Sequence, residues 1–318
     1  RDVVLLAFAG VLLALLIRTP ASWLSDRTSL PVGVSLATVV IGLLAILTLA
    51  FWLRGPEIQS EVRDLRERLP IAAQELKQRL ERHEWGQRAI EQLPSSEELV
   101  PDRESAISKA TGAVSRTFSV LANFVIIIFL GLVFAAGPQP YLYGIVRLIP
   151  VRRQPRAREV LAQIAHTLRW WLVGRLISMT VVGVMTGVGL WALGVPLAFV
   201  LGLLAALLSF IPNLGPLLSA IPAVLLGLAE SPQKALFVAL LYMGVQAVES
   251  WLVNPIIDRK TVYLPPGIVV LAQLTLALAA GLLGVALATP LVAALVVVVK
   301  MLYVEDVLGQ TVMATEDG

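Results

Sequence analysis

The sequence predicts an all-α fold, a polytopic bundle of transmembrane helices that contains two helical hairpins broken by proline and glycine. Three observations predict it. Hydrophobic residues make up 57% of the 318-residue chain and charged residues only 15%, against about 25% in soluble domains. No charged side chain occurs between Leu176 and Ala229, and the run Ile-Pro-Asn-Leu-Gly-Pro at 211–216 interrupts this stretch. Several other apolar runs have the length of a membrane span.

Apolar runs and charge divide the chain into six regions. They are N-terminal transmembrane helices (1–53), a charged extracytoplasmic helical segment (54–117), a further span (118–137), a basic cytoplasmic loop with an interfacial helix (138–175), an apolar core with the broken hairpins (176–300) and a cytoplasmic tail (301–318). The first apolar run follows Arg1-Asp2 directly and has no signal-peptide pattern. We therefore expect that the first native span is missing from this sequence.

Loop charge orients these regions. The loop from Pro138 to Arg175 carries seven arginines against one acid, Glu159, whereas the segment 54–117 holds nearly equal numbers of both signs. The positive-inside rule places the short basic loop in the cytoplasm. The charged segment then lies outside, and the C-terminus lies in the cytoplasm.

Two segments outside the spans show helical periodicity. In the charged segment an apolar stripe recurs every three or four residues, at Ile58, Val62, Leu65, Leu69, Ala72, Leu76 and Leu80. This stripe either packs within a helical hairpin or meets a neighbouring subunit. Residues 156–175 have an apolar face opposite arginines, with Trp170-Trp171 at headgroup level, which predicts an interfacial helix. The alternative is a cytoplasmic helix that covers the bundle.

Two prolines and a glycine interrupt the long uncharged stretch. Pro212 and Pro216 lack the backbone donor that a helix needs, and Gly215 tolerates unwound backbone. The apolar halves on either side have about 15 residues each, or roughly 22 Å as helix, which is less than the ~30 Å hydrocarbon core. Short interrupted segments of this kind form the mid-depth binding sites of membrane transporters.

A second break repeats this pattern. Each series has an initial proline, a glycine-bearing break and a closing proline: Pro196, Asn213-Leu214-Gly215 and Pro222, then Pro265, Gly281, Gly284 and Pro290. The intervals between the outer prolines are 26 and 25 residues. Under the topology above the two series begin on opposite sides, as in the inverted repeats of transporter cores. Four short full spans would give the same loop orientation, so the hairpins are either re-entrant or fully spanning. We expect hairpin tips and hinges at Pro212, Gly215, Pro216, Gly281, Gly284 and Pro290.

One carboxylate lies within an apolar helical segment. Glu249 shares a helix face with Gln246 and Asn254. A carboxylate at membrane depth costs several kcal/mol and is retained where it faces a cavity, an ion path or a partner. We expect a substrate or ion pathway formed by Glu249, Gln246, Asn213, Asn254 and Gln273. The alternative for Glu249 is a structural ion pair with Arg175, Arg259 or Lys260.

Five motifs resemble the autoinducer-2 exporter family of bacterial membrane transporters. They are Phe210-Ile-Pro-Asn-Leu-Gly-Pro216, Gln246-x-x-Glu249 with Asn254-Pro255, Leu264-Pro-Pro266, Gly281-x-x-Gly284 with Ala288-Thr-Pro290, and Leu302-Tyr-Val-Glu-Asp306. The resemblance covers nearly the whole chain and implies a secondary transporter of the bacterial inner membrane that exports a small polar solute. Some members are linked to Na⁺/H⁺ exchange, which implies a cation/proton exchanger coupled through Glu249 as the alternative.

Other functional classes lack their motifs here. The chain has no cysteine, H-E-x-x-H, G-x-S-x-G or P-loop, and its two histidines are far apart in sequence. We therefore expect no enzyme, no metal and no cofactor. The net charge of +3 is small and gives no reason to expect a nucleic-acid partner. A passive channel or membrane scaffold is the alternative from another class. A face of small residues at Ala106, Ala110, Ala113 and Thr117, the apolar stripe of the charged segment and the family resemblance together predict a homo-oligomer.

Overall fold

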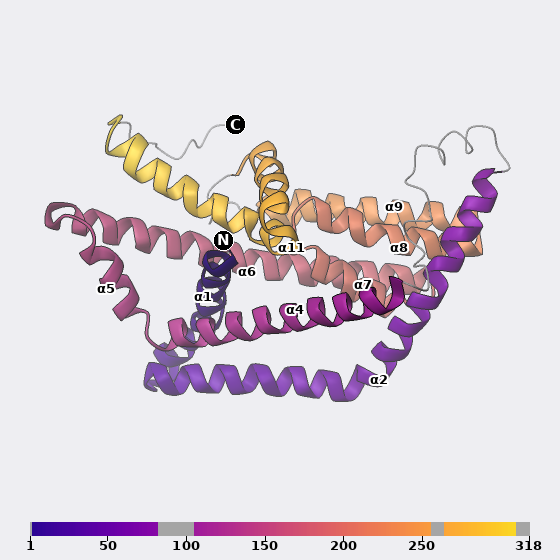
Figure 1. Cartoon of the computed structure of the whole chain (residues 1–318), viewed down its shortest axis with the longest axis horizontal. Helices are drawn as coiled ribbons and strands as arrows, with labels where there is room; N and C mark the ends of the chain where they lie inside the picture. The colour runs from indigo at the N-terminus through magenta and orange to yellow at the C-terminus, as the bar shows by residue number, and fades with distance from the viewer. Residues whose placement is uncertain (1, 82–104, 256–263, 310–318) are drawn as a thin grey trace.

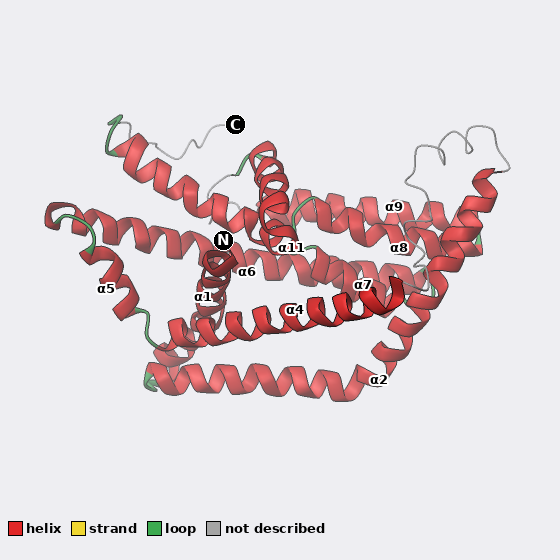
Figure 2. Cartoon of the chain, in the orientation of Figure 1, coloured by secondary structure: helices red, strands yellow, loops and turns green. Residues whose placement is uncertain are grey.

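The computed structural model of the protein describes residues 2–81, 105–255 and 264–309, and these residues form helices joined by short connections (Figures 1 and 2). The helices are α1 (Asp2–Thr28), α2 (Val32–Glu81), α4 (Ser105–Ala136), α5 (Gln139–Arg147), η2 (Val151–Arg153), α6 (Gln154–Ala192), α7 (Ala198–Leu208), α8 (Leu214–Glu230), α9 (Pro232–Val248), η3 (Glu249–Val253), α11 (Pro266–Val299) and η4 (Lys300–Glu305). The predicted all-α fold is confirmed.

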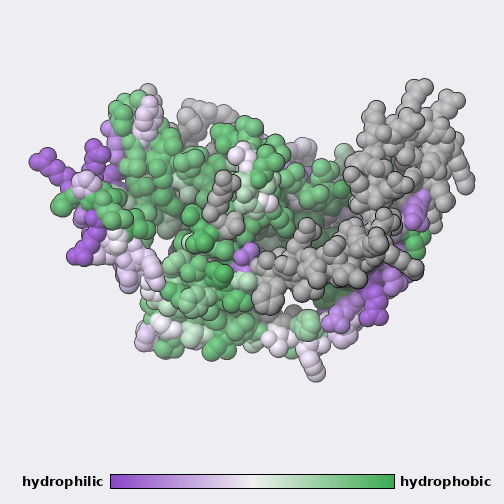
Figure 3. Space-filling model, viewed as in Figure 1, coloured by the Kyte–Doolittle hydropathy of each residue, from purple (hydrophilic) through white to green (hydrophobic). Residues whose placement is uncertain are grey.

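Several of the described helices are long and apolar enough to cross a membrane. Four pass this test alone, and up to six pass if each bent helix pair counts as one span. The four are Val3–Thr28, Val151–Ala192, Pro232–Val253 and Pro266–Glu305. Hydrophobic residues cover the middle of the face shown in Figure 3, and hydrophilic residues gather toward its two ends. This distribution is that of a polytopic membrane protein, as the composition predicted.

The N-terminal helices α1, α2 and α4 form a cluster of their own. Small and aliphatic side chains fill the contact between them, namely Ala14, Ile17, Ala21, Leu36 and Ala135. The helix α2 is bent by 45° between Ile46 and Phe51 and then continues as one helix to Glu81. The predicted boundary at residue 54 is therefore not the end of a helix, because α2 carries the chain from the membrane segment into the charged segment.

The part of α2 beyond the bend, residues 51–81, is named the α2 arm here. It packs against α8 and α7 of the same chain, and Leu65 lies against the buried cluster that α6, α8 and α9 share. Ala72 is also buried, whereas the side chains of Leu76 and Leu80 lie outside the described residues. The hairpin and the contact with a neighbouring subunit stay predictions, and the described part of the arm adds a third contact for the stripe. This part covers an apolar surface of α8 and α7 within its own chain.

The helix α6 corrects a second expectation. It continues through Arg175 without interruption, so residues 156–175 are not a separate interfacial helix. Its apolar face is buried against α1 and α11 through Leu168, Trp171 and Leu172. Trp171, expected at headgroup level, instead packs edge-on against Phe210 at 5.8 Å between ring centroids. The bundle itself offers this face an apolar partner, which agrees with the alternative of a helix that covers the bundle.

A single arginine joins the start of α6 to the C-terminal end of the described chain. Arg156 forms ion pairs with Glu305 at 2.8 Å, Asp306 at 2.9 Å and Glu159 at 3.0 Å. It also donates to the Met301 carbonyl. The basic loop and the C-terminal end therefore lie on the same side of the bundle.

The first predicted break separates α7 from α8. Helix α7 ends at Leu208 and α8 begins at Leu214, and Asn213 has a left-handed φ of 66°. Gly215 is buried at the closest approach of the two helices, where an added Cβ would lie only 1.8 Å from the carbonyl oxygen of Leu208. Only glycine allows the chain to reverse this tightly.

The second predicted break lies inside α11. Ala280 and Gly281 leave the helical conformation, and Gly281 has a φ of 59°. An added Cβ on Gly284 would lie 2.1 Å from the carbonyl oxygen of Leu276. Both breaks therefore place a glycine against a carbonyl of the preceding arm, seven residues back in one case and eight in the other. This shared reversal supports the repeat that the sequence predicted.

The reversal at the first break predicts a stability effect. Gly215→Ala should lower the free energy of unfolding by about 1–3 kcal/mol, the usual cost of overpacking, because the added methyl meets backbone that cannot rotate away. Gly244→Ala is the matched control, since Gly244 lies inside α9 with nothing within 4 Å of an added Cβ. Melting temperatures in detergent measure both, and equal values for the two variants would contradict the prediction.

Candidate functional site

Buried polar side chains gather where α6, η3 and the α7–α8 break meet. They are Arg175 and Ser178 on α6, Ser209 in the break and Glu249 at the start of η3. Arg175 is 8% exposed and Glu249 only 3%. A buried charge requires a partner and further hydrogen bonds to offset lost solvation. The contacts of these residues show how each charge is compensated.

Arg175 binds both the broken backbone and the carboxylate. Its Nε donates to the carbonyl of Phe210 at 3.1 Å, and its Nη2 donates to the carbonyl of Ser209. Its Nη1 lies 3.4 Å from Oε1 of Glu249. The last carbonyls of a helix have no partner within it, and the planar guanidinium offers several donors at fixed angles. One side chain thus compensates the end of α7 and the charge of Glu249.

Glu249 has two further donors. Ser178 donates its hydroxyl to Oε1, and Gln246 donates from Nε2 to Oε2 at 3.3 Å. Both carboxylate oxygens are therefore hydrogen-bonded by side chains of α6 and α9. This geometry is the ion pair with Arg175 that the sequence left open as one alternative, and the polar face around Gln246 is part of the same cluster.

The residue Glu249 begins a π-helix. The segment Glu249–Val253 follows α9 directly, with wider turns than an α-helix. Gln246 still reaches the hydroxyl of Ser250 at 3.5 Å, so the predicted polar face persists. Single π-turns within helices occur frequently at functional sites. This turn could not be predicted, because local composition does not distinguish a π-helix from an α-helix.

Gln273 links the second broken element to the first break. It lies in the first arm of α11, is 1% exposed, and donates from Nε2 to the carbonyl of Pro212 at 3.1 Å. Its Oε1 has no hydrogen-bond partner among the described residues. Leu283 of α11 packs in the same cluster as Phe210. Both breaks therefore contribute to one region of the bundle.

The remaining predicted pathway residues lie at the margin of this cluster. Asn213 is exposed at the turn, and Asn254 is half-buried just beyond η3. The structure does not bring either of them into the contacts around Glu249. Arg259 and Lys260, the other partners considered for Glu249, lie outside the described residues. The predicted hinges are at the breaks, except Pro290, which is buried inside the second arm of α11, and Pro216, which lies within the first turn of α8.

Sequence reasoning missed Ser178 as a ligand of the carboxylate. It lies three residues after Arg175 on α6 and therefore on the same helix face, so the spacing alone could have found it. The carbonyls of Ser209 and Phe210 could not be found in this way, because their role depends on how the break folds against α6.

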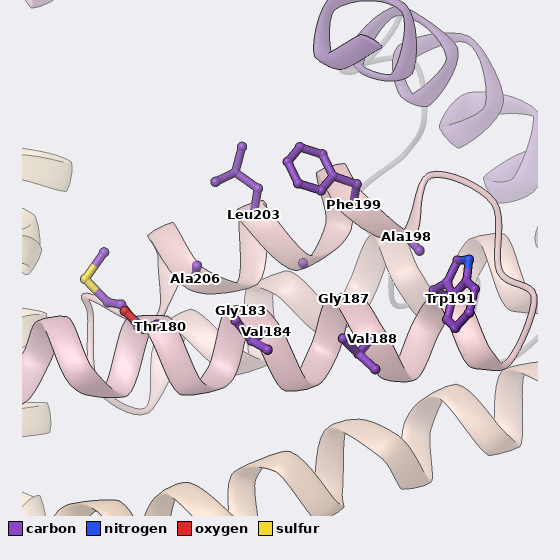
Figure 4. A pocket seen from close by; sticks show the side chains of 12 residues that line it. Thr180, Gly183, Val184, Gly187, Val188, Trp191, Ala198, Phe199, Leu203 and Ala206 are labelled. Atoms are coloured by element: carbon purple, nitrogen blue, oxygen red, sulfur yellow. The ribbon is translucent and has the colours of Figure 1, made fainter. Parts of the chain in front are cut away.

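An apolar groove of about 500 Å³ lies along α6 and α7 (Figure 4). Small residues allow the two helices to approach closely, and larger side chains such as Val184, Val188 and Phe199 line it. Glu249 and Arg175 are not among the lining residues. The polar cluster carries the buried charges and hydrogen-bonding groups, and it is therefore the candidate site. Within the described residues, no group of three or more acidic or histidine side chains could hold a metal ion.

Comparisons with known proteins agree with this architecture. Residues 1–303 match the family described as "AI-2E family transporter". Two related bacterial proteins bear the name "Putative transport protein". YueF of Bacillus subtilis (strain 168) is 26% identical over 265 residues, which cover 80% of this chain and 71% of YueF. MT0215 of Mycobacterium tuberculosis (strain CDC 1551 / Oshkosh) is 26% identical over 301 residues, which cover 89% of this chain and 78% of MT0215.

A third relative, YrrI of Bacillus subtilis (strain 168), is 29% identical over 148 residues, or 46% of this chain and 42% of YrrI. The family is one of transporters rather than enzymes, and the suspected resemblance is confirmed. The long apolar helices, the two breaks and the match over residues 1–303 lead to one conclusion: this chain is a membrane transporter that belongs to the AI-2E family.

Proposed function

We propose that this protein is a secondary transporter that exports a small polar solute, similar to autoinducer-2, by alternating access. The observation that carries the proposal is the contact of Arg175 with both the α7–α8 break and Glu249. A charged pair beside broken helices is the arrangement expected of a binding site inside a membrane bundle. We name Arg175 and Glu249 the central pair.

The central pair would act as the switch of the site. The Nη1–Oε1 distance of 3.4 Å is long for a charge-assisted hydrogen bond, whereas Arg175 also holds two carbonyls. A proton, a cation or a solute hydroxyl that binds Glu249 weakens its attraction to Arg175. A neutralised Glu249 then holds Arg175 less tightly, while the guanidinium keeps the carbonyls of Ser209 and Phe210 as acceptors.

The surrounding groups suit a solute with several hydroxyls. Gln246 and Ser178 offer groups that can both donate and accept. Gln273 adds an amide whose carbonyl oxygen is buried next to the first break. Under this proposal the two hairpins and the helix of Glu249 move together against the earlier spans α1 and α4, and the shared reversals at Gly215 and Gly284 keep each hairpin intact.

A cation/proton exchanger coupled through Glu249 is the second candidate function. It is favoured by the presence of one buried carboxylate in the cluster, since a single such group can carry a proton in one direction and a cation in the other. A passive channel or scaffold is the third. Dependence of transport on an imposed gradient separates the three classes.

We propose a bacterial inner-membrane location with a cytoplasmic C-terminus. The seven arginines between Pro138 and Arg175 support this orientation by the positive-inside rule. The ion pairs of Arg156 with Glu305 and Asp306 support it further, because they tie the C-terminal end to that basic loop.

Glu249→Gln tests the transport role of the carboxylate. The variant should retain its fold, because Gln has nearly the same volume and its amide oxygen can still accept from Arg175 and Ser178. It should lose gradient-dependent transport because it can neither ionise nor take up a proton. Uptake is measured in proteoliposomes with a proton gradient, with a sodium gradient and with none, for autoinducer-2 and for sodium. Glu230→Gln, which changes an exposed acid at the end of α8, is the control. Wild-type transport by Glu249→Gln would overturn the proposal.

Arg175→Gln tests whether the central pair is energetically coupled. Removing one partner of a buried pair costs about 3–5 kcal/mol, and Arg175→Gln should cost more than Glu249→Gln because it also leaves two carbonyls without donors. The double variant should cost less than the sum. Melting temperatures in detergent give the cycle, with Arg169→Gln, an exposed site on the same helix, as control. Additive effects would contradict coupling.

We also propose that the protein is a homo-oligomer with one pathway in each subunit. Large apolar side chains of α2 and α4 are exposed in the single chain, including Ile41, Ile46, Phe124 and Phe129. Native mass spectrometry in mild detergent should therefore detect a defined oligomer that dissociates to monomers in harsher detergent. Monomers alone in the mildest detergent would count against this arrangement.

A further inference from the structure

A carboxylate of the α2 arm binds the start of α7. Oε2 of Glu61 accepts a hydrogen bond from the backbone N–H of Val200 at 3.1 Å, across 139 residues of sequence. Val200 is the third residue of α7, in the turn whose N–H groups have no partner within the helix. Leu197, the residue directly before α7, has a left-handed φ of 62°, and its side chain does not cap the helix. Glu61 therefore supplies a cap from another helix.

The opposite end of α7 binds a cation. Arg175 donates to the carbonyls of Ser209 and Phe210, directly after the last turn of α7. A helix carries partial positive charge at its N-terminus and partial negative charge at its C-terminus. The 11 residues of α7 are thus held between an anion and a cation about 16 Å apart, each matched to the dipole.

The sides of α7 are fixed to α6. An added Cβ on Gly202 would lie 2.7 Å from the Cα of Gly187, and one on Gly183 would lie 2.6 Å from the Cβ of Ala206. Figure 4 shows the helix that carries Leu203 and Ala206 lying along the helix that carries Gly183 and Gly187. Helices that approach this closely move as one unit. Contacts at the two ends of α7 are therefore the ones that can set its position relative to the rest of the protein.

Two contacts at the N-terminal end of α7 differ in where their partners come from. At the α6–α7 turn, Lys234 donates to the carbonyl of Gly194 at 2.8 Å and pairs with Glu230. These groups belong to α8, α9 and the turn itself. Glu61 belongs to the α2 arm, which continues the earlier spans. Its bond to Val200 joins the part of the protein proposed to stay in place to the part proposed to move.

We infer that Glu61 is a positioning residue for transport. Its carboxylate holds the N-terminus of α7 against the α2 arm and so fixes, relative to that arm, the joined α6–α7 pair that carries Arg175 and the carbonyls of Ser209 and Phe210. The inference rests on the proposed function, because it assumes that the central pair is the transport site. It assigns the charged segment outside the membrane spans a role in setting the geometry of that site.

The absence of cysteine from the sequence allows a direct test. Ser209→Cys places a single thiol at a fully buried position, and its reaction with a small water-soluble thiol reagent reports access to the break. Adding Glu61→Gln should raise the labelling rate about tenfold, as expected from loss of a hydrogen bond to a charged group. Adding Glu61→Asp should keep labelling near the parent rate, because it retains the charge at the helix end. Adding Glu67→Gln, at an exposed acid of the same arm, should change nothing.

Transport is measured separately on Glu61→Gln, Glu61→Asp and Glu67→Gln without the added thiol. Glu61→Gln should lower the rate and Glu61→Asp should restore it. Equal labelling of the Glu61→Gln and Glu67→Gln proteins overturns the inference, as does labelling of the Glu61→Asp protein as fast as that of Glu61→Gln. If no variant and no wild-type protein transports the tested solutes, the proposed function fails, whereas the labelling rates still decide whether Glu61 positions the break.

Discussion

The architecture depends on how the unpaired carbonyls at the end of α7 are compensated. A helix that stops inside an apolar bundle leaves carbonyls that water cannot reach. Here Arg175 reaches the carbonyls of Ser209 and Phe210, and its own charge then requires the carboxylate of Glu249. The break, Arg175 and Glu249 therefore depend on one another, because each supplies a hydrogen-bond or charge partner that another requires. Any movement of the break must also change the environment of both charges.

This constraint explains why several elements converge on one region. Glu249 lies at the start of the π-turn after α9, and Gln273 brings the first arm of α11 to the carbonyl of Pro212. Gln273 satisfies a carbonyl of the break directly, and Glu249 pairs with the arginine that satisfies two others. The close backbone approaches at Gly215 and Gly284 keep the two arms of each hairpin together. The interrupted helices thus require hydrogen-bond donors for their free carbonyls and glycines where the chain reverses.

Local chemistry made part of this structure predictable. The breaks could be predicted because proline and glycine act on their own backbone. Glu249 could be predicted as a site residue because an acid in an apolar helix is retained where it faces a cavity, an ion path or a partner. The partnership of Arg175 was left open, because in sequence it ends a basic loop that resembles a cytoplasmic segment. Its burial follows only from α6 continuing through it. The bond between Glu61 and Val200 was beyond prediction, since nothing local signals a contact across 139 residues.

The shortness of α7 also constrains how the chain enters the bilayer during synthesis. An 11-residue helix is about 16 Å long and cannot be inserted as a span of its own. Arg175 lies 74 residues before Glu249, so it leaves the ribosome well before its counter-charge does. The α7–α8 hairpin therefore lacks part of its polar contacts until the helix that carries Glu249 has been synthesised. Membrane insertion of this region is a cooperative step of several segments rather than a succession of independent ones.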